Sequence, residues 1–357
     1  MSRRRLRADA VFQGGGVKVI GLVGALSVAE EQGYQWVSVA GTSAGAIVAA
    51  LLAAGYRASE MKDLLDQLDF RTFRDPPRWA RIPLVGPALA VALTKGLYLG
   101  DALEEWVRDA LARRGVRTFA DLIMPDDPDE RFRFRLQVVA ADVSRGRMVV
   151  LPQDIALYGV RPEELDVARA VRMSAGLPYF YRPVVQYFPT PRGGFPGYIV
   201  DGGLLSNFPV WLFDVAGPPP WPTLGFMLAD PRYGKPHRIR GPVSFGSALV
   251  ATMLEAHDAR HLEASDSVRT IRIPTTGVRT TDFDLTPGQR RRLYEAGVEA
   301  ARRFFAEWDF QRYVRLYRSG SGAGPGAGAV GDARSRSHMR NEVHRDVVQR
   351  RLHFRQR

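Results

Sequence analysis

The chain has 357 residues, of which 45% are apolar and 25% charged, and it contains no cysteine. This composition is typical of a globular protein and excludes disulfide bridges, thiolate catalysis and cysteine-based zinc sites. The 50 Lys and Arg residues against 38 Asp and Glu give a net charge of +12, which indicates either a solvated arginine-rich surface or contact with anionic partners.

The basic start of the chain, Arg3 to Arg7, is not followed by the apolar segment and cleavage site of a signal peptide. Apolar runs such as Ala44–Ala54 fall short of the roughly 18 residues that a membrane-spanning helix needs. We therefore expect a cytoplasmic protein with no transmembrane segment, in peripheral contact with membranes at most.

Short apolar runs and helical patterns alternate along the first hundred residues. A strand at Asp9–Gln13 leads through glycines into a helix at Val19–Gln32, and a strand at Trp36–Ala40 leads through Gly41 into a helix at Ala44–Ala54. This order predicts a parallel sheet with helices packed on its faces. Further helices are expected at Ser59–Leu68, Gly100–Arg114, Leu165–Ser174, Phe245–Ala264 and Thr286–Asp309. Further strands are expected at Phe132–Asp142, Met148–Leu151, Tyr198–Val200, Thr223–Leu228 and Val268–Ile273.

Composition divides the chain into four parts. Residues 8–214 are expected to form a catalytic core, and residues 215–318 the C-terminal part of the same globular unit. Residues 319–333 are rich in Gly and Ala and predict a flexible linker, and residues 334–357 form a basic tail that we expect to be disordered. Within the core, the Pro-, Arg- and aromatic-rich insert Phe70–Leu99 is either a lid or membrane-facing loop, or ordinary core and connector.

The segment Gly41-Thr42-Ser43-Ala44-Gly45 has the form G-x-S-x-G of a nucleophile elbow. The motif needs glycines two residues before and after the serine because side chains there would clash across a tight strand-to-helix turn. The following helix directs its N-terminal N–H groups towards the serine, where they can stabilise negative charge. A chance match in a Gly- and Ala-rich sequence is the competing interpretation, and the flanking strand and helix favour the elbow.

A glycine run, Gly14-Gly15-Gly16-Val17-Lys18, follows the first predicted strand. Its backbone N–H groups suit an anion, which leaves three interpretations: a nucleotide phosphate site, an oxyanion hole and a plain tight turn. The spacing is not that of a P-loop. As an oxyanion hole, the run would use the amides of Gly15, Gly16 and Val17.

Asp201-Gly202-Gly203 ends another predicted strand and supplies a carboxylate with conformational freedom after it. His257 and His261 share a helix face but lack the H-E-x-x-H pattern, so no metal site is expected. Only His237 could complete a Ser-His-Asp triad. The simpler interpretation is a Ser43–Asp201 pair in which the carboxylate takes the hydroxyl proton directly. The six histidines are His237, His257, His261, His338, His344 and His353.

Together and in this order, these three motifs resemble the patatin-like phospholipase family of bacterial lipid acyl hydrolases. Two longer segments, Ala170–Phe180 and Asp201–Pro209, are also similar to family patterns, and the likeness extends from about Ala8 to Asp214. The resemblance implies a three-layer α/β/α fold with a mainly parallel central sheet. It also implies a Ser43–Asp201 dyad acting through an acyl-enzyme on a lipid or ester, without a cofactor. The residues implied to support the motifs are Gly14, Lys18, Gly41, Gly45, Gly202 and Gly203.

One residue departs from the family pattern. Val19 stands where the family usually has glycine, and a β-branched side chain limits the dihedral angles of a turn. The alternative function is therefore a catalytically weak or inactive lipid- or protein-binding scaffold on the same fold. A nucleotide or nucleic-acid binder is a weaker alternative because it makes no use of Ser43 or Asp201, and no specific nucleic-acid partner is expected.

Overall fold

The computed structural model describes residues 6–81, 86–125, 129–191, 193–229, 264–275 and 277–318, with six isolated positions between 239 and 252. The predicted linker, the predicted basic tail and all six histidines lie outside the described residues, as does most of the predicted helix Phe245–Ala264.

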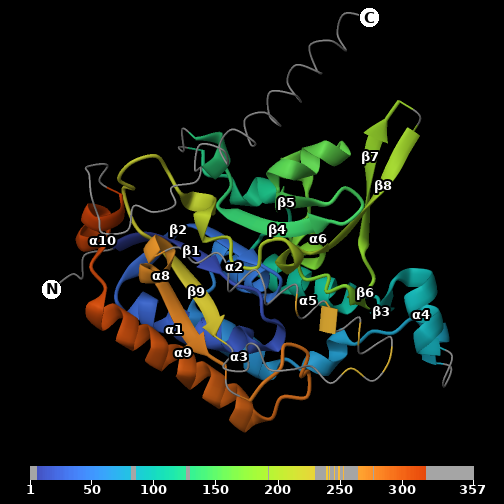
Figure 1. The fold of residues 1–357 in the computed structure, drawn as a ribbon, viewed down its shortest axis with the longest axis horizontal. Helices are drawn as coiled ribbons and strands as arrows, with labels where there is room; N and C mark the ends of the chain where they lie inside the picture. Colours follow the sequence, from blue (N-terminus) through green and yellow to red (C-terminus); the bar gives the residue numbers. More distant parts are fainter. Residues whose placement is uncertain are drawn as a thin grey trace, which may run out of the picture.

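A sheet of eight strands forms the centre of the molecule (Figure 1). Its strands are β1 (Leu6–Phe12), β2 (Tyr34–Thr42), β4 (Leu136–Asp142), β5 (Arg147–Leu151), β7 (Val184–Thr190), β8 (Gly193–Asp201), β9 (Thr223–Ala229) and β10 (Thr270–Pro274). The order is β10-β9-β1-β2-β4-β8-β7, with β5 beside β4. The first five of these strands are parallel, whereas β5 and β8 pair antiparallel with β4, and β7 with β8. The predicted α/β fold with a mainly parallel sheet is confirmed.

Helices and turns cover both faces of this sheet. The helices are α1 (Val19–Glu31), α2 (Ala44–Ala53), α3 (Ala58–Gln67), α4 (Gly86–Thr94), α5 (Asp101–Ala112), α6 (Val167–Ser174), α8 (Ala264–Val268), α9 (Pro287–Glu307) and α10 (Phe310–Tyr317). On one face, strand residues such as Phe12 and Val138 join the main core with α1, α2, α6 and α9. On the other, Val11 and Val139 pack with the helical turn Val210–Phe213. None of the described helices is long and apolar enough to cross a bilayer.

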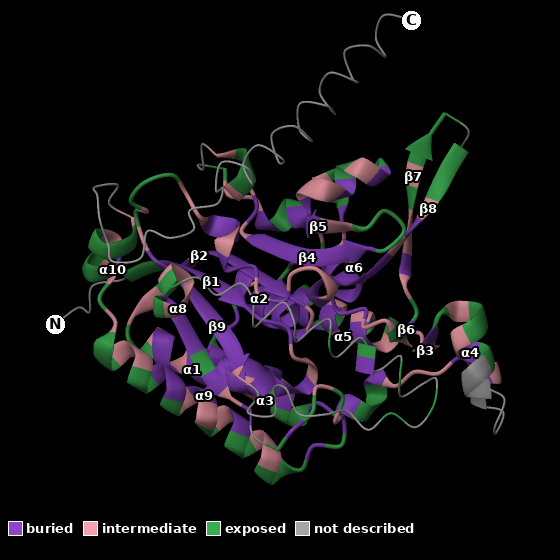
Figure 2. Ribbon diagram, viewed as in Figure 1, coloured by how far each residue is buried: buried purple, intermediate pink, exposed green. Residues whose placement is uncertain are grey.

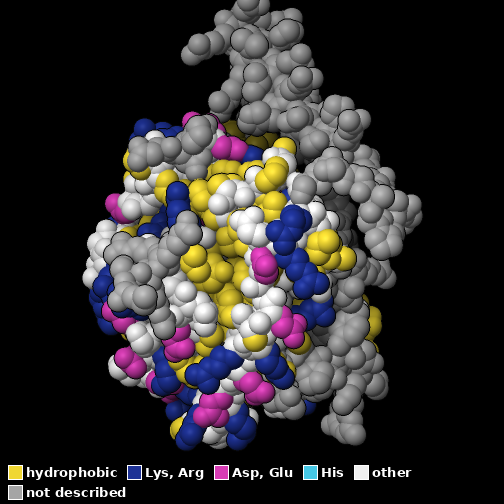
Figure 3. Space-filling model, turned by 90° about the vertical axis from the view of Figure 1, so that its left-hand side faces the viewer, with side chains coloured by type: hydrophobic (Ala, Val, Ile, Leu, Met, Phe, Trp, Pro, Cys, Tyr) yellow, Lys and Arg dark blue, Asp and Glu magenta, His cyan; other side chains and the backbone are white. Residues whose placement is uncertain are grey.

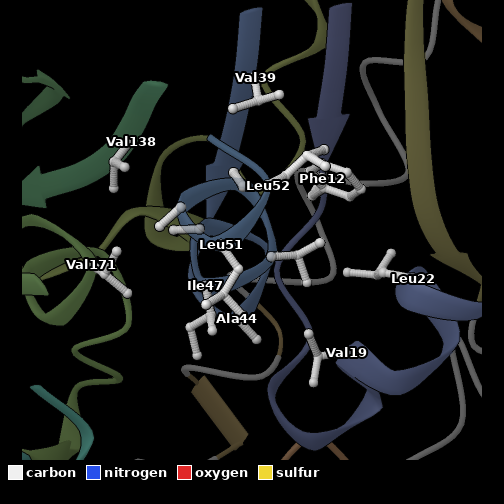
Figure 4. Close-up of a cluster of buried hydrophobic side chains, with 14 of the residues drawn as sticks. Phe12, Val19, Leu22, Val39, Ala44, Ile47, Leu51, Leu52, Val138 and Val171 are labelled. Atoms are coloured by element: carbon white, nitrogen blue, oxygen red, sulfur yellow. The ribbon is translucent and has the colours of Figure 1, made fainter. Parts of the chain in front are cut away.

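Helix α2 is buried on every side (Figure 4). All ten of its residues are small or apolar, and a helix that is apolar all round has to be enclosed. Ile47 and Leu51 lie among side chains of the sheet and of neighbouring helices, including Val138 of β4 and Val171 of α6. The start of α2 is thereby held rigidly against the sheet.

Two regions differ from the sequence prediction. The insert Phe70–Leu99 contains α4 and a short strand β3 (Gly96–Tyr98), which pairs with β6 (Tyr179–Tyr181). Phe70 and Phe73 are buried, so the first half of the insert is ordinary core. Strand β8 also begins well before the predicted Tyr198–Val200, and with β7, which was not predicted, it forms a hairpin whose outer part is exposed (Figure 2). The exposed part lacks a buried face, so its sequence carries no apolar alternation.

Glycines allow α1 and α9 to approach closely. A Cβ on Gly297 would lie 2.0 Å from the carbonyl oxygen of Gly21, and a Cβ on Gly24 would lie 2.1 Å from that of Tyr294. Contacts with backbone atoms cannot be relieved by a side-chain rotation. The packing of these two helices therefore depends on the absence of side chains at this crossing.

We expect Gly297→Ala to lower the free energy of unfolding by about 1–3 kcal/mol, because overpacking outweighs the better helix propensity of alanine. Gly288→Ala in the same helix is the matched control, since its Cβ would meet only the Arg292 side chain at 3.7 Å. Urea denaturation of both variants measures the difference. Equal stability of the two would show that the close approach is not needed.

Candidate functional site

Ser43 lies at the turn between β2 and α2, with φ 54° and ψ −129°. This left-handed region is strained for a residue with a side chain, at a cost of about 1–3 kcal/mol. Backbone segments approach one another closely at this turn. A Cβ on Gly41 would lie 2.3 Å from the carbonyl oxygen of Gly45, and a Cβ on Gly45 would lie 2.3 Å from that of Phe12. The two glycines make the turn sterically possible, and the buried α2 holds it in place.

Asp201 is the last residue of β8 and faces this serine. Thr42 pairs with Val139 on β4, and the next residue of β4, Ala140, pairs with Asp201, so the two strand ends lie at the same level of the sheet. The Ser43 Oγ donates a hydrogen bond to Asp201 Oδ2 at 2.6 Å. The other carboxylate oxygen accepts from the Gly203 amide at 2.8 Å. The structure thus brings together the two residues predicted as nucleophile and base.

The environment of Asp201 changes its acidity. The side chain is almost fully buried, and burial raises its pKa to about 6, while hydrogen bonds from Ser43 and Gly203 act in the opposite direction. A carboxylate with a pKa near 6 remains ionised at neutral pH, yet it accepts a proton more readily than an exposed one. This is the acidity that suits a general base.

Ser174, the last residue of α6, is hydrogen-bonded to the backbone of the elbow. Its Oγ accepts a hydrogen bond from the Ser43 amide at 2.8 Å and donates to the Val139 carbonyl of β4 at 2.5 Å. The site prediction omitted this residue. The available signal was the segment Ala170–Phe180, in which Ser174 matches the family's serine, although nothing local reveals which atoms that serine contacts.

The glycine turn after β1 also reaches the site. A Cβ on Gly14 would lie 2.9 Å from the Ser43 Cβ and 2.4 Å from Asn207 Oδ1, and the Gly14 amide donates to the Asn207 carbonyl. Within the described part of the chain, the amides of Gly15 and Gly16 have no hydrogen-bond partner. Amides without a partner are a requirement of the predicted oxyanion hole.

The prediction that the Val17 amide belongs to the oxyanion hole requires a correction. This amide donates to the Thr280 carbonyl at 3.2 Å, so it is already occupied and does not serve as the predicted third oxyanion donor. Lys18 is buried beside Gly15. Val19 has φ −47° and ψ −29°, which are ordinary helical angles, and its side chain packs in the core (Figure 4). A β-branched residue therefore imposes no strain at this position.

Around these residues, the described chain contains no group of three or more His, Asp or Glu side chains arranged to hold a metal ion. The predicted absence of a metal site stays a prediction because the histidines lie outside the described residues. Gly202 lies against the Val139 carbonyl, where a Cβ would approach to 2.1 Å. The geometry thus brings a serine hydroxyl, a buried carboxylate and a glycine turn with two amides unpaired among the described residues to one edge of the sheet.

Comparisons with known proteins give a consistent family. The sequence model of the patatin-like phospholipase family matches residues 10–214. YqhO, an uncharacterized protein of Bacillus subtilis (strain 168), is 40% identical over 304 residues, which cover 85% of this chain and 99% of that protein.

Among solved structures, VipD from Legionella pneumophila is 19% identical with a TM-score of 0.49, and the match covers 84% of this chain and 66% of VipD. ExoU in its complex with SpcU, from the type III secretion system of Pseudomonas aeruginosa, is 18% identical with a TM-score of 0.44. That match covers 87% of this chain and 52% of ExoU, so the chain spans about half of the ExoU chain.

The raised pKa of Asp201 predicts a specific effect on stability. An aspartic acid titrates near pH 4 in an unfolded chain, so between about pH 4 and 6 the folded protein holds a proton that the unfolded chain has released. Stability from this group is therefore present at low pH and is lost as pH rises through this window. Asp201→Asn removes the loss and should gain on the order of 1–3 kcal/mol over the parent protein between pH 4 and pH 7.

Urea denaturation of both proteins at several pH values measures this gain. Ser43→Ala provides a second check, because it removes a hydrogen bond that lowers the Asp201 pKa. In Ser43→Ala the Asp201 pKa should be higher than in the parent, so the loss of folding stability with rising pH should continue to a higher pH. Parallel stability curves for the parent and Asp201→Asn would contradict the assignment.

Proposed function

Because the chain belongs to the patatin-like phospholipase family, we propose that it is a serine lipid acyl hydrolase in which Ser43 is the nucleophile and Asp201 the base. The observation that carries this proposal is the 2.6 Å hydrogen bond from Ser43 Oγ to Asp201 Oδ2. It is supported by the strained backbone of the elbow, by the half-buried position of Ser43, and by the Gly15 and Gly16 amides, which are unpaired among the described residues.

In the acylation step, Ser43 Oγ attacks the carbonyl carbon of an ester while its proton passes to Asp201 Oδ2. The tetrahedral oxyanion accepts hydrogen bonds from the Gly15 and Gly16 amides. Collapse of this intermediate breaks the bond between the acyl carbon and the alcohol oxygen. The alcohol leaves with the proton from Asp201, and the acyl group remains on Ser43.

In the deacylation step, a water molecule gives a proton to Asp201 and attacks the acyl carbonyl, again passing through an oxyanion at the glycine turn. Collapse releases the carboxylic acid, and Ser43 regains its proton from Asp201. Both steps balance without any cofactor. Ser174 acts as a positioning residue, because its hydrogen bond fixes the Ser43 backbone rather than contacting substrate.

A lipid is the proposed substrate because the family is one of lipid-acting enzymes and because part of the insert has an apolar exposed surface. Leu89 and Leu93 of α4 are exposed, and the exposed Lys95 follows this helix directly and lines the same cavity as Leu93. An exposed apolar helix face flanked by cations suits the surface of an anionic membrane. We infer that α4 forms the peripheral membrane contact.

Removal of either catalytic group should abolish turnover. Ser43→Ala and Asp201→Asn are each expected to lower kcat/KM for a p-nitrophenyl ester and for phospholipid vesicles by at least about 10³-fold. Ser27→Ala in α1 is the matched control, since that hydroxyl donates to the Gly24 carbonyl of its own helix. A fluorophosphonate probe should label the parent and Ser27→Ala but not Ser43→Ala. Absence of labelling in the folded parent would favour the inactive scaffold instead.

The pH profile of the reaction should follow the ionisation of Asp201. Because the ionised carboxylate is the base, kcat/KM should rise roughly tenfold per pH unit below its pKa and level off above about pH 6. A soluble ester measured between pH 4.5 and 8, with corrections for its spontaneous hydrolysis, gives the profile. A flat or falling profile across this range would rule out Asp201 as the base.

A further inference from the structure

A cavity of about 390 Å³ lies where the end of α4 meets α6, the start of β7 and β8. These elements come together on the right-hand side of the molecule in Figure 1. The cavity contains none of the residues assigned to catalysis. Its charged lining consists of Lys95, Arg169, Arg172, Arg182 and Asp101.

Four cations and one carboxylate make this lining strongly positive. The charge distribution is different on the face shown in Figure 3, which is the left-hand side of Figure 1. On that face, Lys and Arg side chains are interspersed with Asp and Glu around an apolar area. Two of the cavity cations are compensated: Arg169 pairs with Glu104 at 2.9 Å and Arg182 pairs with Asp101 at 3.2 Å. The described residues offer no ion-pair partner to Arg172 or Lys95, which leaves two positive charges unbalanced at the cavity.

Arg172 is held rigidly although its charge is unpaired. Its Nη2 donates to the carbonyl oxygens of Leu99 and Arg182, at 2.6 Å each, and its guanidinium lies 5.0 Å from the centre of the Tyr181 ring. Only 2% of the residue is exposed, and Nη1 has no hydrogen-bond partner among the described residues. A buried cation without a counterion is costly, so this arrangement favours a bound anion nearby.

Lys95 forms the outer part of the same lining. It follows α4 directly, has φ 62°, and is exposed with its Nζ 4.9 Å from the centre of the Tyr198 ring. The left-handed backbone conformation is uncommon for a lysine and directs the chain sharply from α4 into β3. The result is an accessible cation at the mouth of a cavity whose inner wall holds a buried one.

We propose that this cavity binds a phosphate monoester, carried either by a lipid headgroup or by a soluble molecule. A phosphate monoester has a charge of roughly −1.5 to −2 at neutral pH, which matches the two unpaired cations, and its oxygens suit guanidinium groups. The apolar side chain of Leu93 also lines the cavity, next to the exposed part of α4. A lipid-borne phosphate would therefore enter with its acyl chains beside an apolar surface.

Binding is measured with the full chain carrying Ser43→Ala, so that the result does not depend on turnover. Glycerol 3-phosphate in calorimetry tests the soluble source. Sedimentation with phosphatidylcholine vesicles containing phosphatidic acid tests the lipid source, and phosphatidylglycerol, a phosphodiester, is the anionic comparison. Binding to either monoester probe supports the proposal, and the probe that binds identifies the source.

Substitutions then locate the site. Lys95→Gln should weaken monoester binding about 5- to 10-fold, and Lys95→Glu more strongly, as expected for loss of a charge-assisted contact. Arg182→Gln should also weaken it. Arg291→Gln is the matched control, because it removes an equal charge from the exposed face of α9. Circular dichroism verifies that each variant is folded.

The proposal would be overturned if neither monoester probe bound. It would also be overturned if the Lys95→Glu variant bound the probe as tightly as the protein with Lys95, or if Arg291→Gln weakened binding as much as Lys95→Gln does. Equal binding to phosphatidylglycerol vesicles would overturn the preference for a monoester. If the parent protein showed no esterase activity while the cavity still bound a phosphate monoester, only the catalytic proposal would be contradicted.

Discussion

The close passage of the backbone between β2 and α2 is the constraint on which the site depends. Two glycines remove the side chains that would clash there, and the fully buried α2 prevents the turn from relaxing. Ser43 is consequently held at φ 54°. The strain of about 1–3 kcal/mol is small beside the apolar burial of ten helical residues, so the core maintains a conformation that the turn alone would not adopt.

The same logic applies to Asp201, whose burial opposes stability and assists chemistry. Exposure to water would stabilise the carboxylate and lower its affinity for a proton. Its burial in the protein interior raises its pKa to about 6, and the hydrogen bonds from Ser43 and Gly203 keep it oriented. The fold tolerates this cost because the strand pairing of β8 with β4 positions the residue independently of its charge.

Sequence patterns indicate the position of residues whose determinants are local. The strand-to-helix turn at Ser43 is encoded within five residues, and Asp201 ends a strand followed by glycines, so the place of both in the fold was predictable. The partners of Ser174 and Val17 depend on contacts 131 and 263 residues distant, with Ser43 and Thr280, and no local pattern reports such contacts. The exposed β7–β8 hairpin was missed for a different reason: without a buried face it carries no periodic signal.

Helix α6 contributes residues both to the surroundings of Ser43 and to the basic cavity. Ser174 at its end fixes the backbone of Ser43, and Arg172, one half-turn earlier, lines the basic cavity. Residues two apart on a helix point in different directions, so one short helix serves both places without a shared side chain. An anion beside Arg172 would offset the charge buried in this helix and so stabilise the element that supports the nucleophile. Binding in the cavity would therefore act on the elbow through the position of α6, with no contact between ligand and Ser43.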